Sequence, residues 1–218
     1  MTAEAWVTAA MERWKPLETR VPMDSLGVDV ARGGKDQTII APRHGNWFGE
    51  LIRYPGTETP NGPMVAGLVI QERRDAAPVH IDIIGVGSSP YDFLVQNGVQ
   101  AIPVNVSKAA RKGKVPETTR EGEVAFFNTR SMIIWRMREA LDPANGELIA
   151  LPPDEDLKKE LCMAKWSFGK TGIRVEAKEE IVKRLQHSPD LADAVCLANM
   201  DTPKASLTGK KIDYAGWG

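Results

Sequence analysis

The stretch VHIDIIGVGSSPYDFLVQNGVQAIPV, residues 79–104, contains a strand, a helix and a second strand in succession. Residues 79–86 are apolar on both faces, which is typical of a central strand in a parallel sheet. Residues 88–98 begin with Ser and Pro and end with Gly, as helices do. Another apolar run follows at 99–104, so the sequence predicts a parallel crossover.

Residues upstream of this unit predict an antiparallel part of the same sheet. Apolar runs separated by short turns, the pattern of an antiparallel meander, occur at 26–31, 37–43 and 46–54. A helix is predicted at 61–75. Downstream, we expect a surface loop at 105–124, a short strand at 146–152, a β-hairpin at 165–177 and helices at 129–141, 154–164, 178–186 and 187–200.

Three aspartates lie where these elements should be buried. We expect Asp29 in the middle of the first strand, on the face of the small residues Gly27 and Ala31. We expect Asp82 in the middle of the first parallel strand and Asp193 in the apolar part of the last helix. Burying a carboxylate costs free energy unless it is paired or bound to a metal ion.

The order of the elements, three antiparallel strands, helix, strand, helix, strand and then further helices, is that of the ribonuclease H-like fold. We therefore predict an α/β domain with a mixed five-stranded sheet, flanked by helices and extended by a β-hairpin. In such a sheet the first and fourth strands are neighbours, and a late helix packs beside them. Asp29, Asp82 and Asp193 would then converge. Clustered carboxylates are stable mainly with divalent cations between them, and oxygen ligands favour Mg²⁺ or Mn²⁺.

Each acid also has an ordinary structural explanation. Asp29 could hold the next turn, Asp82 could pair with a Lys or Arg, and Asp193 could lie on a helix surface. Asp190 falls in the first turn of the last helix, after Ser188 as the expected N-cap, where the helix dipole stabilises an acid without metal. A spacing of three residues nevertheless places Asp190 beside Asp193, so we expect it to be an auxiliary ligand.

Composition limits the possible functions. The chain has 218 residues, 42% of them hydrophobic, which is enough for a sizeable core. Its net charge of -1 creates no global attraction to nucleic acid, and no apolar run reaches membrane-spanning length. DNA binding would need a local basic patch that contacts phosphates, although such a patch could equally be a solvated loop. The densest basic cluster consists of Lys108, Arg111, Lys112 and Lys114.

Two histidines lie near the acids in the sequence. His80 shares a strand face with Asp82, and His187 precedes Asp190 by three residues. Either could approach a metal ion, but a lone histidine in such positions is more commonly a core or surface residue. We expect His80 in the core and His187 at the helix start.

Four stretches resemble the nuclease domain of bacteriophage terminase large subunits. They are LGVDVARGGKDQTII (26–40), VHIDIIGVGSSPYDFL (79–94), FFNTRSMIIWRMREAL (126–141) and IRVEAKEEIVKRLQHSPDLADAVCLA (173–198). The resemblance covers roughly residues 24–200. Its last stretch is the most specific, because a Lys-Glu helix is followed by Arg-Leu, Ser-Pro-Asp and Asp-Ala.

This resemblance implies a metal-dependent endonuclease, a hydrolase that cuts concatemeric viral double-stranded DNA during genome packaging. The metal-binding acids would be Asp29, Asp82 and Asp193, with Asp190 as a possible fourth. The hypothesis is two-metal hydrolysis by two Mg²⁺ or Mn²⁺ ions about 4 Å apart. The implied partners are a terminase ATPase domain, the small terminase subunit and the portal protein, and the implied location is the cytoplasm of a bacterial host.

The resemblance leaves the domain organisation and two alternatives open. Large terminase subunits also have an N-terminal packaging ATPase, which this sequence lacks, so we expect residues 1–23 to be a linker helix and residues 24–218 to be the nuclease domain. One alternative is a Holliday-junction-resolvase-like or other ribonuclease H-like nuclease. The other is a catalytically silent DNA-binding or portal-docking domain, against which the three acids argue.

Overall fold

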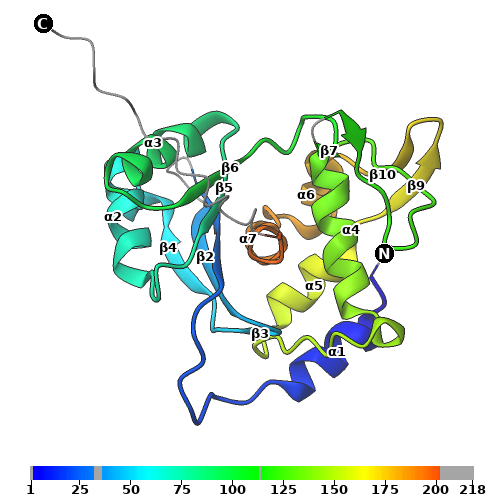
Figure 1. The fold of residues 1–218 in the computed structure, drawn as a ribbon, viewed down its shortest axis with the longest axis horizontal. Helices are drawn as coiled ribbons and strands as arrows, with labels where there is room; N and C mark the ends of the chain where they lie inside the picture. Colours follow the sequence, from blue (N-terminus) through cyan, green and yellow to red (C-terminus); the bar gives the residue numbers. More distant parts are fainter. Residues whose placement is uncertain (1, 32–35, 113, 202–218) are drawn as a thin grey trace, which may run out of the picture.

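A computed structural model describes residues 2–31, 36–112 and 114–201 (Figure 1). Of the expected nuclease domain, residues 32–35, 113 and 202–218 lie outside these ranges. The main sheet has the strand order β3-β2-β1-β5-β6, and β4 also pairs with β2. Its strands are β1 (Ser25–Asp29), β2 (Gln37–His44), β3 (Trp47–Phe48), β4 (Ile52–Pro55), β5 (Val79–Asp82) and β6 (Ala101–Val104).

The pairing of the strands confirms the predicted ribonuclease H-like topology. β1 is antiparallel to β2 and parallel to β5, and β5 is parallel to β6. The predicted third strand is broken, because β3 and β4 both pair with β2 but are separated by residues 49–51. Its two halves still follow one edge of β2, and the Gly49 N–H donates to the Pro42 carbonyl at 2.9 Å. The sheet thus has six segments where five strands were predicted.

Two strands end earlier than the sequence pattern indicated. Asp29 and Asp82 are the last residues of β1 and β5, so their predicted positions in the middle of strands were wrong. After β5 the chain turns at Gly85, which has a φ of 70°, into the 3-10 helix η2 (Gly85–Gly87). Because β1 and β5 are parallel neighbours, both carboxylates lie at the C-terminal ends of these strands, at the same end of the sheet.

Helices cover both faces of the sheet (Figure 1). α2 and α3 pack together on one face, where Val65, Val69 and Leu94 meet the side chains of β1 and β5. α7 lies against the other face, α4 and α5 pack against α7, and α1 packs against α5 and α4. The helices are α1 (Glu4–Arg13), α2 (Gly62–Glu72), α3 (Ser88–Gln96), α4 (Thr129–Leu141), α5 (Glu155–Met163), α6 (Lys178–Leu185) and α7 (Asp190–Ala198). None of the helices in the described ranges is long and apolar enough to cross a membrane.

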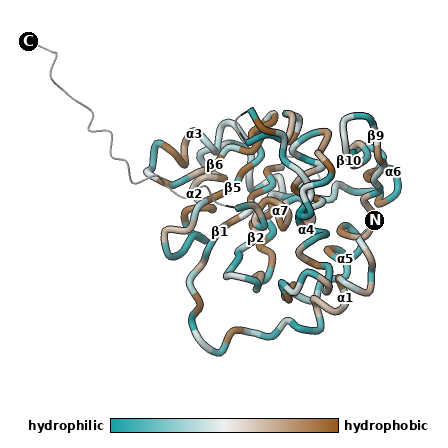
Figure 2. Tube along the Cα trace, turned by 45° about the vertical axis from the view of Figure 1, so that its right-hand side comes forward, coloured by the Kyte–Doolittle hydropathy of each residue, from teal (hydrophilic) through white to brown (hydrophobic). Residues whose placement is uncertain are grey.

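The central helix α7 makes the closest contact with the sheet, and Figures 1 and 2 both place it between the sheet and α4. All of its residues except Asp190 and Asp193 are buried. A side-chain carbon at Gly27 would overlap the backbone of Ala194 and Ala198, so only glycine lets the helix lie this close to β1. The Ser25 hydroxyl donates to the Ala198 carbonyl at 2.6 Å.

Helix α1 also contributes to the core. Val7 and Ala10 are fully buried, and the Leu151 N–H donates to the Ala10 carbonyl at 3.1 Å. Trp14, which follows the helix, stacks on Trp47 with ring centroids 5.6 Å apart. The helix within residues 1–23, expected to be a linker, thus packs on the core that the sheet and the other helices form.

The smaller elements match the sequence expectations in part. The predicted hairpin is present as β9 (Trp166–Gly169) and β10 (Gly172–Val175). Within the predicted surface loop, β7 (Arg111–Lys112) and β8 (Val115–Pro116) form a second small hairpin. The prediction of a strand at 146–152 is wrong, because this segment forms only one isolated β-bridge, between Ala150 and Trp47. Two further 3-10 helices are η1 (Gly56–Glu58) and η3 (Pro143–Asn145).

The contact at Gly27 can be tested by adding one carbon atom. Gly27→Ala should reduce the free energy of unfolding by about 3 kcal/mol or more, because the backbone of α7 must move away from β1. Gly67→Ala is the matched control: a carbon there meets nothing within 4 Å, and replacing glycine in a helix should stabilise by about 1 kcal/mol. Urea denaturation measures both values. Equal stability of Gly27→Ala and the wild type would contradict the close contact.

Candidate active site

The three predicted acids meet at one end of the sheet. Asp29 ends β1, Asp82 ends β5, and Asp193 lies near the start of α7. All three line one cavity of about 310 Å³, between the sheet edge, α7 and the first turn of α4. Side chains from three distant parts of the sequence therefore converge, as expected from the predicted fold.

Lys178, the first residue of α6, lies among these acids. Its ammonium is 2.8 Å from Asp193 Oδ2, 3.4 Å from Asp190 Oδ1 and 3.6 Å from Asp29 Oδ2. This residue was not predicted from the sequence. One signal could have found it: a cation at the N-terminus of a helix is disfavoured by the helix dipole, so a lysine there needs acidic neighbours.

The charges of the site shift one another's pKa values. Burial raises the pKa of Asp29 well above its usual range, Lys178 opposes this shift, and the charges of Asp193 and Asp190 add to it. Burial also raises the pKa of Asp82, and Asp193 adds to that shift. Burial alone would lower the pKa of Lys178, but its acidic neighbours together raise it above the usual value. Lys178 is therefore held as a cation, and it compensates part of the repulsion between the carboxylates.

Asp190 differs from its predicted setting. Ser188 is not the N-cap of α7: the N-cap position is Pro189, and no side chain of the N-cap residue accepts a bond from the helix. The Ser188 hydroxyl instead donates to Asp190 Oδ1. Asp190 contacts Lys178 and influences Asp29, but it lines a different cavity from Asp193. It thus forms part of the wall between the two cavities.

The donor set fits a hard divalent cation, although the carboxylates are not arranged around one. Within the described ranges, no group of three or more His, Cys, Asp and Glu side chains has the geometry to hold a metal ion. The Lys178 ammonium lies between the carboxylates instead. Oxygen donors of this kind suit Mg²⁺ or Mn²⁺. Asp29, Asp82 and Asp193 would hold such an ion, and it would compete with Lys178 for them.

The predicted basic cluster lies next to the acid cavity. Lys108, Arg111 and Lys112 line a neighbouring cavity of about 1050 Å³. The loop that carries them continues from Val106 and Ser107, which line the acid cavity. Lys114 is exposed but does not line either cavity.

Arg130 is a second cation in the wall of the acid cavity that the sequence analysis did not single out. It lies in the first turn of α4, and its Nη1 group donates to the carbonyl of Glu176 at 2.7 Å. This bond links α4 to the segment that leads into Lys178.

The histidines do not join the acids. His80 is fully buried, and neither ring nitrogen has a hydrogen-bond partner in the described part of the chain. Burial lowers the pKa of His80 to about 4, so the ring is neutral. His187 is partly exposed, with Nδ1 2.8 Å from the Ser188 carbonyl and 3.5 Å from Glu160 Oε1. Neither histidine lines the acid cavity.

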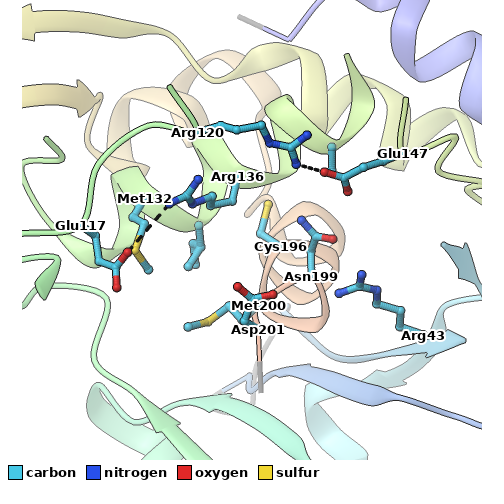
Figure 3. Close-up of a pocket in the computed structure, with 12 residues that line it drawn as sticks. Arg43, Glu117, Arg120, Met132, Arg136, Glu147, Cys196, Asn199, Met200 and Asp201 are labelled. Carbon is cyan, nitrogen blue, oxygen red and sulfur yellow. Dashed lines mark ion pairs between the residues drawn. The ribbon is translucent and has the colours of Figure 1, made fainter. Parts of the chain in front are cut away.

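Another cavity, of about 330 Å³, lies at the C-terminal end of α7 (Figure 3). Three arginines project toward it, but Arg120 pairs with Glu147 and Arg136 lies 3.8 Å from Glu117. Arg43 bonds the carbonyl of Ala198 at 3.3 Å. The charged side chains of this cavity thus mostly have partners, and none of the three predicted acids lines it.

Solved structures share this arrangement of elements. The nuclease domain of the large terminase subunit gp2 of bacterial virus Sf6 aligns with a TM-score of 0.69 and 19% sequence identity, over 92% of this chain and 98% of that one. The chain has the fold of a large-terminase nuclease domain. The large terminase nuclease of thermophilic phage G20c, solved with bound magnesium, aligns with a TM-score of 0.57 and 16% identity, over 91% and 97%. A mutant Sf6 domain was solved with manganese, at a TM-score of 0.67 and 18% identity, over 92% and 98%. No family model and no curated protein sequence matches the chain.

Replacing Lys178 tests its role as an internal counter-charge. Lys178→Met should lower the melting temperature in EDTA by several degrees, because three carboxylates lose the cation between them. Added Mn²⁺ should then raise the melting temperature more than it does in the wild type, because no ammonium competes for the acids. Lys170→Met, at an exposed turn position, is the control. A higher melting temperature of Lys178→Met in EDTA would contradict this role.

Proposed function

We propose that the chain is a divalent-metal-dependent endonuclease that cuts concatemeric double-stranded viral DNA during genome packaging. The observation that carries the proposal is the convergence of Asp29, Asp82 and Asp193, from three separate elements, in one cavity. The large-terminase nuclease fold, and the magnesium and manganese bound in two of the similar structures, support it. A non-catalytic DNA-binding or docking domain would not need three partly buried carboxylates, and burying them lowers the stability of the fold.

The proposed reaction is hydrolysis of a phosphodiester bond with two bound metal ions. Two Mg²⁺ or Mn²⁺ ions would supply a water of lowered pKa and stabilise the charge of the leaving oxygen. Asp29 and Asp82 are fixed at the ends of paired strands, and Asp193 is fixed on a buried helix, so all three are rigid ligands. Lys178 holds the carboxylates together until the ions replace it. Once released, its ammonium can bind a phosphate oxygen of the DNA.

Asp193 and Asp190 have different ranks in this proposal. Asp193 lines the acid cavity and is an essential ligand, whereas Asp190 lines the neighbouring cavity and is auxiliary. In a plasmid-cleavage assay over a Mn²⁺ titration, Asp193→Asn and Asp82→Asn should lower the rate by at least 100-fold, the order of magnitude expected when a transition-state contact is lost. Asp190→Ser should lower it less.

The control for these variants is Asp92→Asn, an exposed acid on α3 that should leave cleavage unchanged. EDTA should stop cleavage by the wild type. Cleavage that persists unchanged in EDTA would rule out the metal-dependent mechanism. A dead Asp190→Ser variant beside an active Asp193→Asn variant would reverse their ranks.

We further propose that the basic cluster guides the DNA backbone to the acid cavity. Replacing Lys108, Arg111, Lys112 and Lys114 together by Gln should weaken DNA binding and flatten its salt dependence. Each phosphate contact that is lost should reduce the slope of log affinity against log salt by about 0.9. Replacing Lys158, which is half-buried, and the exposed Lys159 and Lys183, on α5 and α6, is the control. An unchanged slope would show that these basic side chains are solvated and do not contact the DNA.

The partners of the proposed function follow from packaging: a terminase ATPase domain, the small terminase subunit and the portal protein, in the cytoplasm of a bacterial host. Linear duplex DNA and a four-way junction, compared as substrates, distinguish the packaging nuclease from a junction resolvase. Preference for the junction would favour the resolvase. Binding of either DNA without any cleavage would favour a silent domain.

A further inference from the structure

Glu160, on the inner face of α5, is a buried acid that the proposed reaction does not use. Its side chain is 2% exposed, and Oε2 accepts a hydrogen bond from the Ala192 N–H of α7 at 2.9 Å. Burial raises the pKa of Glu160 to about 8, and the charges of Asp190 and Asp193 add to the shift. Within the described ranges, its one possible ion-pair partner is the partly exposed His187, at 3.5 Å.

The N-terminus of α7 lacks a cap from its own sequence. The first N–H groups of a helix have no acceptor inside it and need one from elsewhere. Pro189 has no side-chain acceptor, and the Ser188 hydroxyl is bonded to Asp190. Glu160 supplies the missing acceptor from a neighbouring helix, and it does so at Ala192, the residue directly before Asp193.

This bond fixes the part of α7 that carries the acids. Glu160 and Asp190 line a second cavity of about 310 Å³ on the side away from Asp82. Asp193 instead faces Lys178 and the acid cavity. The first turn of α7 is thus held between Lys178, which attracts its acidic side chains, and Glu160, which binds its backbone.

We propose that Glu160 is a positioning residue, whose hydrogen bond to the α7 backbone sets the place of Asp193 relative to Asp29 and Asp82. The inference rests on the proposed function, because it concerns the ligands of the same metal site. A purely structural cap would cost less stability with a neutral acceptor, such as a glutamine amide. A buried acid near two other acids costs stability, and a cap at residue 189 could bond the helix locally.

Three substitutions separate the hydrogen bond from the charge and from packing. Glu160→Gln keeps an acceptor at the same reach and cannot ionise. Glu160→Asp keeps an ionisable carboxyl group but withdraws it by one carbon atom, and Glu160→Met fills similar space without an acceptor. Glu155→Gln, on the exposed face of α5, is the matched control.

Calorimetric titration with Mn²⁺ alone and plasmid cleavage are measured well below the melting temperature of each variant. Glu160→Gln should stay within threefold of the wild type in both. Glu160→Asp and Glu160→Met should bind Mn²⁺ at least tenfold more weakly and lose at least tenfold in kcat, with KM for DNA within twofold. If Glu160→Met does not fold, the comparison of Gln with Asp decides.

Two outcomes would overturn the positioning role. Wild-type Mn²⁺ affinity and kcat in Glu160→Asp would show that the bond to α7 does not set the ligands. Equal losses in Gln and Asp would show that an acceptor at the native reach is not enough to set the ligands. If the wild type binds Mn²⁺ but cuts no DNA, the proposed function fails, and the Mn²⁺ affinities of the variants still decide whether Glu160 positions the ligands.

Discussion

The close approach of α7 to β1 is the contact on which the rest of the structure depends. Gly27 leaves room for the helix backbone, and the helix in turn covers the middle of the sheet with seven buried residues. α4 and α5 then pack against α7, and α1 packs against α4 and α5. The same contact brings Asp193 beside Asp29. The packing of α7 on the sheet therefore also assembles the acid site.

The repulsion between the carboxylates of the acid site is offset by a positive charge and not by hydrogen bonds alone. Carboxylates that lie together raise one another's pKa and destabilise the fold. Lys178 lies within 4 Å of three of them and stabilises the cluster without an ion. The ammonium reaches these acids from the start of α6 on a flexible side chain, so a divalent cation, as proposed above, could replace it. The folded chain keeps its acids near one another without a metal ion.

The sequence allowed much of this arrangement to be predicted, for reasons visible in particular residues. Apolar runs and helix boundaries are local signals, so the elements and their order along the chain could be derived from them. The pairing of the first and fourth strands, and with it the convergence of Asp29 and Asp82, followed from the match of that order to the ribonuclease H-like fold. The contacts of Lys178 and Glu160 could not, because each joins segments that are distant in sequence or belong to different helices. The end of β5 at Asp82 was missed because Ile83 and Ile84 continue the apolar pattern while the backbone turns.

The two ends of α7 carry opposite charges that suit its dipole. Asp190, Asp193 and Glu160 surround its N-terminus, where the positive end of the dipole favours acids, and Arg43 bonds the last carbonyl at its C-terminus. Lys178 has the opposite relation to its own helix, since a cation at the start of α6 is disfavoured there. Its position must therefore be maintained by the acids of α7 and β1. In the proposed reaction, a metal ion bound by those acids would leave nothing in α6 itself to retain the ammonium, so Lys178 would be the charge that moves and the carboxylates the part that stays fixed.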